Sequence, residues 1–158
     1  MNLPHDESGR REYAEALKSN PGFESLVSLI EALLGDGGCP WDQTRKLEDC
    51  PKYLNSELDE VIAAIESGDN SNLEEELGDL LFMLAFTIKV AEKEEKVEMS
   101  RLFSRIIDKM VFRHPHVFGG DLAAGTPDEV VSNWAKLKSR EKAAAKGQVE
   151  ERPESERA

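Results

Sequence analysis

Two copies of one helical pattern, nineteen residues apart, constrain most strongly how this chain can fold. In each copy, apolar residues recur at positions i, i+4, i+7, i+8 and i+11, which is the spacing of one helix face and not of a strand. These positions are Leu54, Leu58, Val61, Ile62 and Ile65 in the first copy, and Leu73, Leu77, Leu80, Leu81 and Leu84 in the second. The pattern predicts two amphipathic helices of closely similar design.

Each copy also carries two acidic residues at positions i and i+3, so both carboxylates project from one side of their helix. The pairs are Glu57 with Glu60, and Glu76 with Asp79, and they lie at equal distances on either side of Gly68. The segment around this glycine, residues 67–71, has the composition of a turn. The sequence therefore predicts an antiparallel helical hairpin that brings four carboxylates together.

Four converging carboxylates need a counter-charge, because their mutual repulsion and their burial both raise their pKa values. In the second helix, Phe82, Met83 and Phe86 extend the apolar surface around the acidic side, which predicts burial in a larger bundle. A divalent cation with oxygen ligands, Mg²⁺ or alternatively Mn²⁺, would supply the charge. Acidic residues beside an apolar helix face more commonly form a solvated surface, and that alternative stays open.

The composition indicates one soluble domain with a hydrophobic core, because 39% of the 158 residues are hydrophobic and 33% are charged. No apolar run approaches the length of about 18 residues that spans a bilayer, and the N-terminus lacks the features of a signal peptide. Cys39 and Cys50 have no CxxC spacing, so we expect reduced thiols and a cytoplasmic location. The net charge of −12 argues against binding to a nucleic-acid polymer, but it leaves room for a small phosphorylated ligand.

No strand alternation of useful length is present, so the predicted fold class is all-α, a bundle of about five helices. We expect residues 1–20 to form a polar extension, 21–142 the folded domain, and 143–158 a flexible charged tail. Apolar residues outside a single inward face, such as Phe82, Phe86 and Phe112, predict a homodimer or a higher homo-oligomer. The predicted helices cover roughly residues 12–18, 23–34, 51–66, 72–93 and 99–110, and a last one that begins at Pro127. Asn72 with Glu75 and Thr126 with Glu129 are the expected caps of the helix over 72–93 and of the last helix, respectively.

Three segments, in this order and spacing, resemble the MazG family of nucleoside triphosphate pyrophosphohydrolases. They are Gly38-Cys39-Pro40-Trp41-Asp42-Gln43-Thr44, the acidic hairpin, and Arg113-His114-Pro115-His116-Val117-Phe118. A late segment, Trp134-x-x-x-Lys138-x-x-Glu141, also matches, and the resemblance covers roughly residues 23–142.

The resemblance implies an all-α fold whose four-helix core forms with a dimer partner. It also implies Mg²⁺-dependent hydrolysis of nucleoside triphosphates between the α and β phosphates, which gives a monophosphate and pyrophosphate. Glu57, Glu60, Glu76 and Asp79 match the family's metal ligands. Ser56 stands where the family usually has a further glutamate, so a catalytically weakened nucleotide-binding or dimerising module is an alternative function. A metal-free acidic helical adaptor is another.

Further residues are candidates for contact with the reacting groups and the substrate. Either Glu57 or Glu60 would orient the attacking water. Cations that would contact phosphates are Lys109, Arg113 and Lys138, and aromatic rings that would stack on a base are Trp41 and Trp134. Exposed surface cations and core or interface tryptophans are the competing interpretations. His114 and His116 lack a second group of metal ligands, so we expect them to order a loop.

Overall fold

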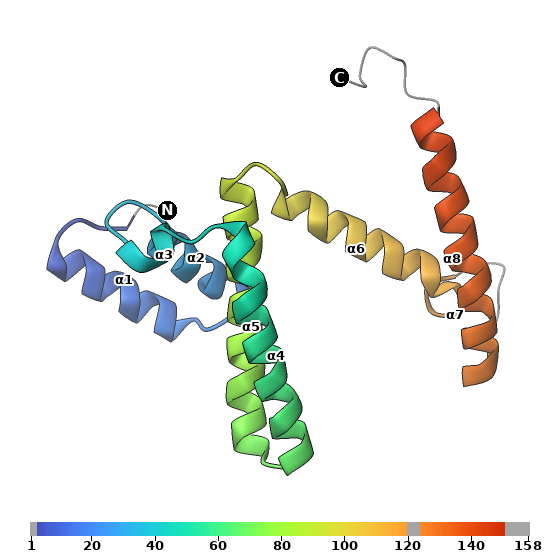
Figure 1. Ribbon diagram of the computed structural model, residues 1–158, viewed down its shortest axis with the longest axis horizontal. Coiled ribbons are helices and arrows are strands. Elements are labelled where there is room, and N and C mark those ends of the chain that lie inside the picture. Colours follow the sequence, from blue (N-terminus) through green and yellow to red (C-terminus); the bar gives the residue numbers. More distant parts are fainter. Residues whose placement is uncertain (1–2, 120–123, 151–158) are drawn as a thin grey trace. The chain divides into compact units, whose positions relative to one another are not determined.

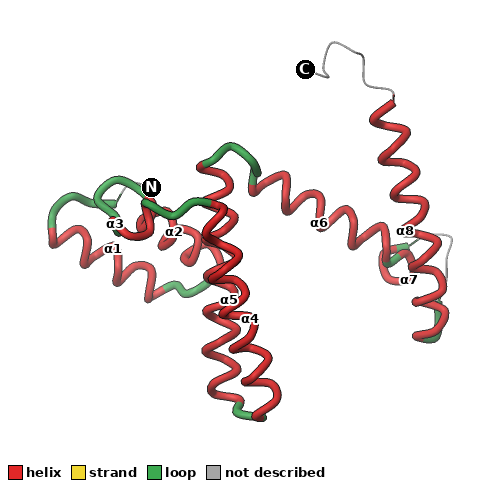
Figure 2. Tube along the Cα trace, in the orientation of Figure 1, coloured by secondary structure: helices red, strands yellow, loops and turns green. Residues whose placement is uncertain are grey.

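The computed structural model describes residues 3–119 and 124–150, with side chains up to residue 141. Within these residues it contains helices and no strand (Figure 2), which confirms the all-α prediction. The chain divides into two compact units, one up to Met99 and one from Ser100 onward, and each is described by itself. In the described part of the chain, no helix is both long and apolar enough to cross a membrane.

The first unit is built around an antiparallel hairpin of two long helices (Figure 1). Helix α2 packs against α5, and α1 and the short α3 both contact α2. The elements of this unit are α1 (Glu7–Ser19), α2 (Phe23–Leu34), α3 (Pro40–Gln43), the 3₁₀-helix η1 (Leu47–Asp49), α4 (Cys50–Ser67) and α5 (Asn70–Lys93). The helical hairpin predicted from the duplicated pattern is therefore present as α4 and α5.

The turn of the hairpin is shorter than its composition suggested. Helix α4 ends at Gly68, whose φ of 71° is a left-handed conformation that glycine adopts without a Cβ penalty. Asp69 then caps α5, because its carboxylate accepts from the backbone N–H groups of Ser71 at 3.0 Å and Asn72 at 3.2 Å. The expectation that Asn72 begins the second helix is wrong, since the Asp69 cap allows α5 to begin two residues earlier.

The hydrophobic core of the first unit lies toward the C-terminal half of α5. Small residues such as Ala85 and Cys50 let the helices approach closely, and the ring centroids of Phe82 and Phe86 lie 6.0 Å apart. The fully buried members of this core are Ile30, Cys50, Ala85, Phe86 and Val90. The core thus joins α2, the start of α4 and α5, and it leaves the other half of the hairpin outside.

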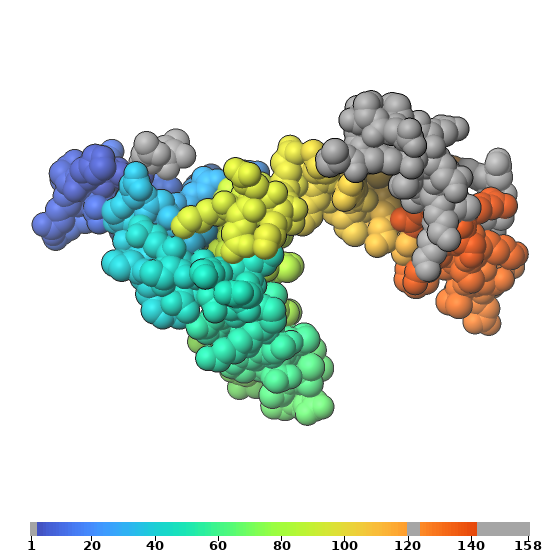
Figure 3. Space-filling view, turned by 45° about the horizontal axis from the view of Figure 1, so that its top comes forward, coloured from blue at the N-terminus to red at the C-terminus, as the bar shows by residue number. Residues whose placement is uncertain are grey.

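Toward the turn, only a few hairpin side chains are buried, namely Val61 and Ala64 on α4. Six large apolar side chains of the hairpin are between 44% and 61% exposed: Leu58, Ile62, Ile65, Leu77, Leu81 and Leu84. We call these six residues the apolar face. The turn end of the hairpin stands clear of the rest of the first unit in the space-filling view (Figure 3). The prediction that the second helix is buried therefore holds only for its C-terminal half within a single chain.

An ion-pair network fastens α2 to α5. The Lys89 ammonium lies 2.9 Å from a Glu31 carboxylate oxygen and 2.7 Å from one of Glu92. The other carboxylate oxygen of Glu92 accepts from the backbone N–H of Met99 at 2.7 Å, at the start of the next helix. These side chains are partly buried, so solvent screens the pairs less than it would on an open surface.

The second unit contains α6 (Met99–Arg113), α7 (Pro115–Phe118) and α8 (Pro127–Glu150). The predicted cap of α8 is confirmed: Glu129 N–H donates to the Thr126 hydroxyl at 3.4 Å, and Thr126 N–H donates to the Glu129 carboxylate at 3.2 Å. The backbone of α8 is helical to Glu150, whereas residues 151–158 of the predicted tail lie outside the described residues. The flexibility of residues 143–158 stays a prediction.

The short helices α3 and α7 were not predicted. Each begins with a proline at its first position, Pro40 and Pro115, where the fixed φ angle suits a helical turn and the missing N–H costs nothing. Both span only four residues, which is too short for a periodic apolar pattern to reveal.

Truncation of Ile30, which is fully buried, tests the position of the core. We expect Ile30→Ala to lower the free energy of unfolding by about 2–5 kcal/mol, because it removes buried methyl groups and leaves a cavity. Leu29→Ala, at the exposed neighbouring position, serves as the control and should cost less. Chemical denaturation of both variants measures the difference, and equal losses would contradict this core assignment.

Candidate functional site

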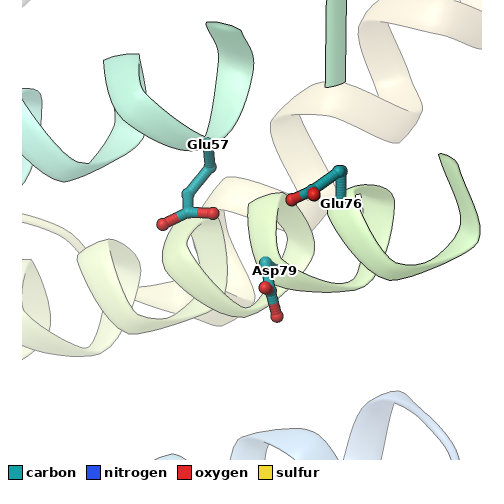
Figure 4. Close-up of side chains that lie close together, drawn as sticks. All are labelled: Glu57, Glu76 and Asp79. Carbon is teal, nitrogen blue, oxygen red and sulfur yellow. The ribbon is translucent and has the colours of Figure 1, made fainter. Parts of the chain in front are cut away.

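Three of the four acidic side chains that were predicted to converge do so between the two helices of the hairpin. Glu57 on α4 faces Glu76 and Asp79 on α5 (Figure 4). One carboxylate oxygen from each residue lies within 4.8 Å of the others. We call Glu57, Glu76 and Asp79 the carboxylate cluster. It arises because the Gly68 turn places the acidic sides of both helices opposite each other.

The fourth predicted ligand, Glu60, lies beside the carboxylate cluster and not within it. One oxygen of Glu60 accepts a hydrogen bond from the Ser56 hydroxyl at 3.3 Å, one helical turn earlier. Glu60 also lies close enough to Glu76 that its negative charge contributes to the raised pKa of Glu76. The structure therefore separates three gathered carboxylates from one neighbour whose orientation Ser56 influences.

The electrostatics of the carboxylate cluster favour a bound cation. Partial burial raises the pKa of Glu57, and the negative charges of Glu60 and Asp79 raise it further. Partial burial likewise raises the pKa of Glu76, with added contributions from Glu60, Glu75 and Asp79. Nearby negative charges make ionisation of these groups unfavourable, and a divalent cation would reverse that effect.

The spacing of the carboxylate oxygens suits a small divalent cation. Octahedral Mg²⁺ with oxygens at about 2.1 Å places neighbouring ligands about 3 Å apart and opposite ligands about 4.2 Å apart. The observed limit of 4.8 Å lies just above that range, so small side-chain rotations would let all three residues reach one ion. All three residues offer carboxylate oxygen, the donor type that Mg²⁺ and Mn²⁺ prefer.

Trp41 packs against Tyr53 and Arg45 in the first unit. Its ring meets Tyr53 edge-on at 5.7 Å between centroids, and the Arg45 guanidinium lies 4.4 Å above the Trp41 ring. The adjoining cavity measures only about 30 Å³, which is too small for a nucleobase. A stacked base would therefore have to use exposed Trp41 surface that Arg45 leaves open. The contact of Arg45 with Trp41 was not predicted from the sequence, because Arg45 lies beyond the end of α3, where helical spacing no longer applies.

The remaining predicted substrate residues, Lys109, Arg113, Trp134 and Lys138, lie in the second unit. Arg113 is engaged there by Glu141. Its Nε and Nη2 atoms both donate to Oε2 of Glu141, at 2.9 Å and 2.6 Å, and its side chain is only 11% exposed. The ion pair joins the end of α6 to α8. Trp134 and Lys138 are exposed and lie on the same side of α8 as Glu141, at i+4 and i+7 spacing.

His114 makes a polar contact that fastens the segment after α6, which is a short helix and not the expected loop. Nδ1 of His114 lies 2.5 Å from the carbonyl oxygen of Met110, and the rings of His114 and His116 lie 5.7 Å apart. The His114 carbonyl accepts from Val117 and Phe118, which closes the turn of α7. The described groups of three or more metal-ligating side chains do not include either histidine.

Comparison with known proteins agrees with this site. The family model described as MazG nucleotide pyrophosphohydrolase domain matches residues 45–118, which include the whole carboxylate cluster. The chain is 35% identical over 122 residues to "Nucleoside triphosphate pyrophosphohydrolase" of Escherichia coli K12, covering 77% of this chain and 46% of the relative. It is 33% identical over 124 residues to "Nucleoside triphosphate pyrophosphohydrolase/pyrophosphatase MazG" of Thermotoga maritima, covering 78% of this chain and 47% of that protein. The chain thus spans about half the length of these curated relatives.

A solved structure supports the fold. The crystal structure of a MazG-related protein from Thermotoga maritima superposes with a TM-score of 0.65 and 28% identity, over 73% of this chain and 98% of that one. Sequence segments, fold and family model agree, and the chain belongs to the MazG family.

Proposed function

We propose that the protein hydrolyses nucleoside triphosphates to a nucleoside monophosphate and pyrophosphate in a Mg²⁺-dependent reaction. The observation that carries this proposal is the convergence of Glu57, Glu76 and Asp79 from two helices in a region that raises carboxyl pKa values. The names of the relatives support the reaction class. A cytoplasmic location, which fits the two free cysteines, is part of this proposal.

In this proposal, the carboxylate cluster holds Mg²⁺, which neutralises negative charge on the phosphate oxygens when it is bound. Glu60 is the better candidate for orienting the attacking water, because Glu57 is committed to the carboxylate cluster. The hydrogen bond from Ser56 limits the rotation of Glu60 and keeps one of its oxygens directed along α4. An ionised Glu60 can accept a proton from that water.

In the second unit, Lys109, Lys138 and Trp134 are proposed contacts to the phosphates and the base, and in the first unit Trp41 is a proposed contact to the base. Arg113 has a different role in this proposal, because its guanidinium already donates to Glu141. We infer that Arg113 positions α8 and so places Lys138 and Trp134, without itself touching the substrate. A largely buried arginine with a carboxylate partner is a poor free ligand for phosphate, since exchange of partners would leave Glu141 unpaired.

A homodimer is part of the proposal. The six residues of the apolar face are exposed in the single chain, and their burial against a second copy would remove that surface from water. A two-fold arrangement of two hairpins would give the four-helix core that the sequence resemblance implies. Each hairpin has the required amphipathic design.

Substitution of Glu76 tests the carboxylate cluster and the reaction together. We expect Glu76→Gln to reduce pyrophosphate release by more than the roughly 10–100-fold that loss of a metal ligand's hydrogen-bonding partner costs. The assay incubates each ribo- and deoxynucleoside triphosphate with Mg²⁺ and measures pyrophosphate. Glu74→Gln, on the exposed side of α5, is the matched control and should keep full activity.

In the absence of metal, the Glu76→Gln variant should be more stable than the parent protein. The pKa of Glu76 is raised above its ordinary value of 4.5, so the native state keeps a proton that the unfolded chain has released. Stability therefore falls as the pH rises from the pKa of the unfolded chain through the raised pKa of the native state. Glu76→Gln removes this loss, so its Tm at neutral pH in EDTA should exceed the parent's, and Mg²⁺ should raise its Tm less.

Turnover by the Gln variant at the parent's rate would refute the ligand assignment. A Mg²⁺-dependent rise in the parent's Tm without any turnover would favour the alternative of a weakened nucleotide-binding module, for which Ser56 is the motive. The absence of both turnover and a Mg²⁺-dependent rise in Tm would favour a metal-free adaptor.

A charge exchange separates the two roles of Arg113. We expect Arg113→Ala to destabilise the second unit by about 2–4 kcal/mol, because it leaves the partly buried Glu141 without its partner. The double variant R113E/E141R restores the pair in reverse and should recover stability and most of the turnover. Fluorescence of Trp134, in a Trp41→Phe background, reports the unfolding. Recovery of stability without turnover would show that Arg113 contacts the substrate directly.

Charged substitutions on the apolar face test the dimer. Ile62→Lys and Leu77→Lys should each shift the protein toward monomer, because a lysine ammonium would be buried without a partner in the interface. Sedimentation velocity across a concentration series measures the change, and Leu29→Lys on α2 is the control. A parent protein that sediments as a monomer at every concentration would overturn the dimer.

A further inference from the structure

A second charged site lies at the other end of α5, away from the carboxylate cluster. A hollow of about 500 Å³ opens between the segment after α3 and the C-terminal turns of α5. We call it the basic groove; its charged residues are Arg45, Lys46, Lys93 and Lys96, with Glu48 and Glu94. We propose that the basic groove binds an oligophosphate anion, either free pyrophosphate or the phosphate chain of a nucleotide that is not the hydrolysed substrate.

The charge balance of the groove is opposite to that of the whole protein. Four cations face two carboxylates in the groove, a local charge of +2, whereas the full chain carries −12. A cavity lined mainly by one sign of charge concentrates counter-ions of the other sign. The groove therefore offers a local attraction for anions on a protein that otherwise repels them.

Arg45 is already held in place for binding. Its guanidinium stacks over the Trp41 ring, its Nε donates to the Trp41 carbonyl at 3.2 Å, and its Nη2 donates to the Thr44 hydroxyl at 2.9 Å. None of these partners is a carboxylate, so they fix the guanidinium without neutralising it. An arginine ordered in this way loses little side-chain freedom on binding and still has unused N–H donors.

Lys93 is the second basic residue of the groove, after Arg45, for which the ion pairs found among the described residues include no carboxylate partner. Its ammonium donates to the carbonyl oxygen of Gln43 at 3.3 Å, across the groove. This contact joins α5 to the segment that carries Arg45 and directs the ammonium toward the groove. Arg45 and Lys93 together supply two uncompensated positive charges on opposite walls.

The groove already accommodates one carboxylate of the chain itself. Glu94 accepts from the backbone N–H of Leu47 at 2.8 Å and lies 3.1 Å from the Lys96 ammonium. The hydrogen bond from Leu47 and the interaction with Lys96 hold the pKa of Glu94 below its ordinary value. The local field at this wall therefore stabilises negative charge.

The phosphate chain of a nucleotide held at the carboxylate cluster lies too far from the basic groove to bind there as well, although a base stacked on Trp41 would lie beside Arg45. Asp79 and Lys93 lie on the same helix, fourteen residues apart. At a rise of about 1.5 Å per residue, about 21 Å separates their backbones along α5. A triphosphate chain bound to a cation at Asp79 does not reach that distance, so the groove needs a separate ligand.

An oligophosphate fits the groove better than an anion with a single charge. The cations occupy both walls of an open hollow, and exposed single ion pairs contribute little to binding. A ligand with several charges spread over two or more phosphoryl groups can engage Arg45 and Lys93 together. Arginine binds phosphoryl oxygens through paired N–H donors, and lysine adds a point charge. The interaction should weaken with salt, since the groove is open to solvent.

The test is a titration of the full chain with pyrophosphate in EDTA, which prevents metal-bridged binding at the carboxylate cluster. Backbone amide chemical shifts locate the site, and we expect the largest changes at Thr44, Arg45, Lys46 and Leu47. The variant R45Q/K93Q should weaken binding by at least about tenfold. The control R11Q/K18Q removes the same charge from exposed positions on α1 and should bind like the parent.

A second variant guards against disruption of the Trp41 stack. K93Q/K96Q leaves Arg45 on Trp41 and should also lose affinity. Shifts confined to the groove with a non-hydrolysable nucleotide, but weaker with pyrophosphate, would identify the nucleotide phosphate chain as the preferred source. Equal affinity of all variants, equal shifts with sodium sulfate, or shifts centred elsewhere would overturn the proposal. Because no turnover is measured, a failed proposal here leaves the hydrolase proposal untouched, and the reverse also holds.

Discussion

The packing of α4 against α5 supports every other feature of the first unit. Val61 and Ala64 are buried at the interface, and Gly68 turns the chain so that the two helices run antiparallel. This packing places Glu57 opposite Glu76 and Asp79, whose negative charges repel one another. The carboxylates remain close because buried apolar contacts elsewhere in the hairpin and the core of α5 offset that repulsion. A site with this property is less stable without a cation than with one.

Stability and function are segregated along α5. Its C-terminal half contributes Phe86 and Val90 to the core, and its N-terminal half carries the carboxylates and half of the apolar face. The well-packed half can hold the helix in place while the other half keeps mutually repelling carboxylates and exposed apolar surface, where we propose that a cation and a second copy bind. Natural proteins commonly concentrate such unfavourable features at functional sites. Along the same helix, Lys93 brings positive charge to the far end, about 21 Å from Asp79.

Sequence reasoning predicted the parts that depend on local periodicity. The two long helices, the turn at Gly68 and the cap at Thr126 all follow from spacing and residue type, because these features involve residues close together in the chain. The predicted cap of the second helix was wrong, because Asp69, three residues before Asn72, caps α5 instead. Sequence reasoning also gave no sign that Glu141 occupies the Arg113 guanidinium, since the two residues are 28 positions apart.

The sequence by itself determined that the chain is helical, that its two acidic helix faces meet, and that it resembles the MazG family, because helix periodicity and the mirror arrangement about Gly68 are properties of the chain alone. Only the tertiary structure decided which carboxylates gather. It left Glu60, which accepts a hydrogen bond from Ser56, outside the group formed by Glu57, Glu76 and Asp79. It also placed basic side chains on both sides of a groove. The physical reason is that ligand geometry depends on side-chain rotamers and helix packing at the scale of an ångström, which the spacing of letters does not encode.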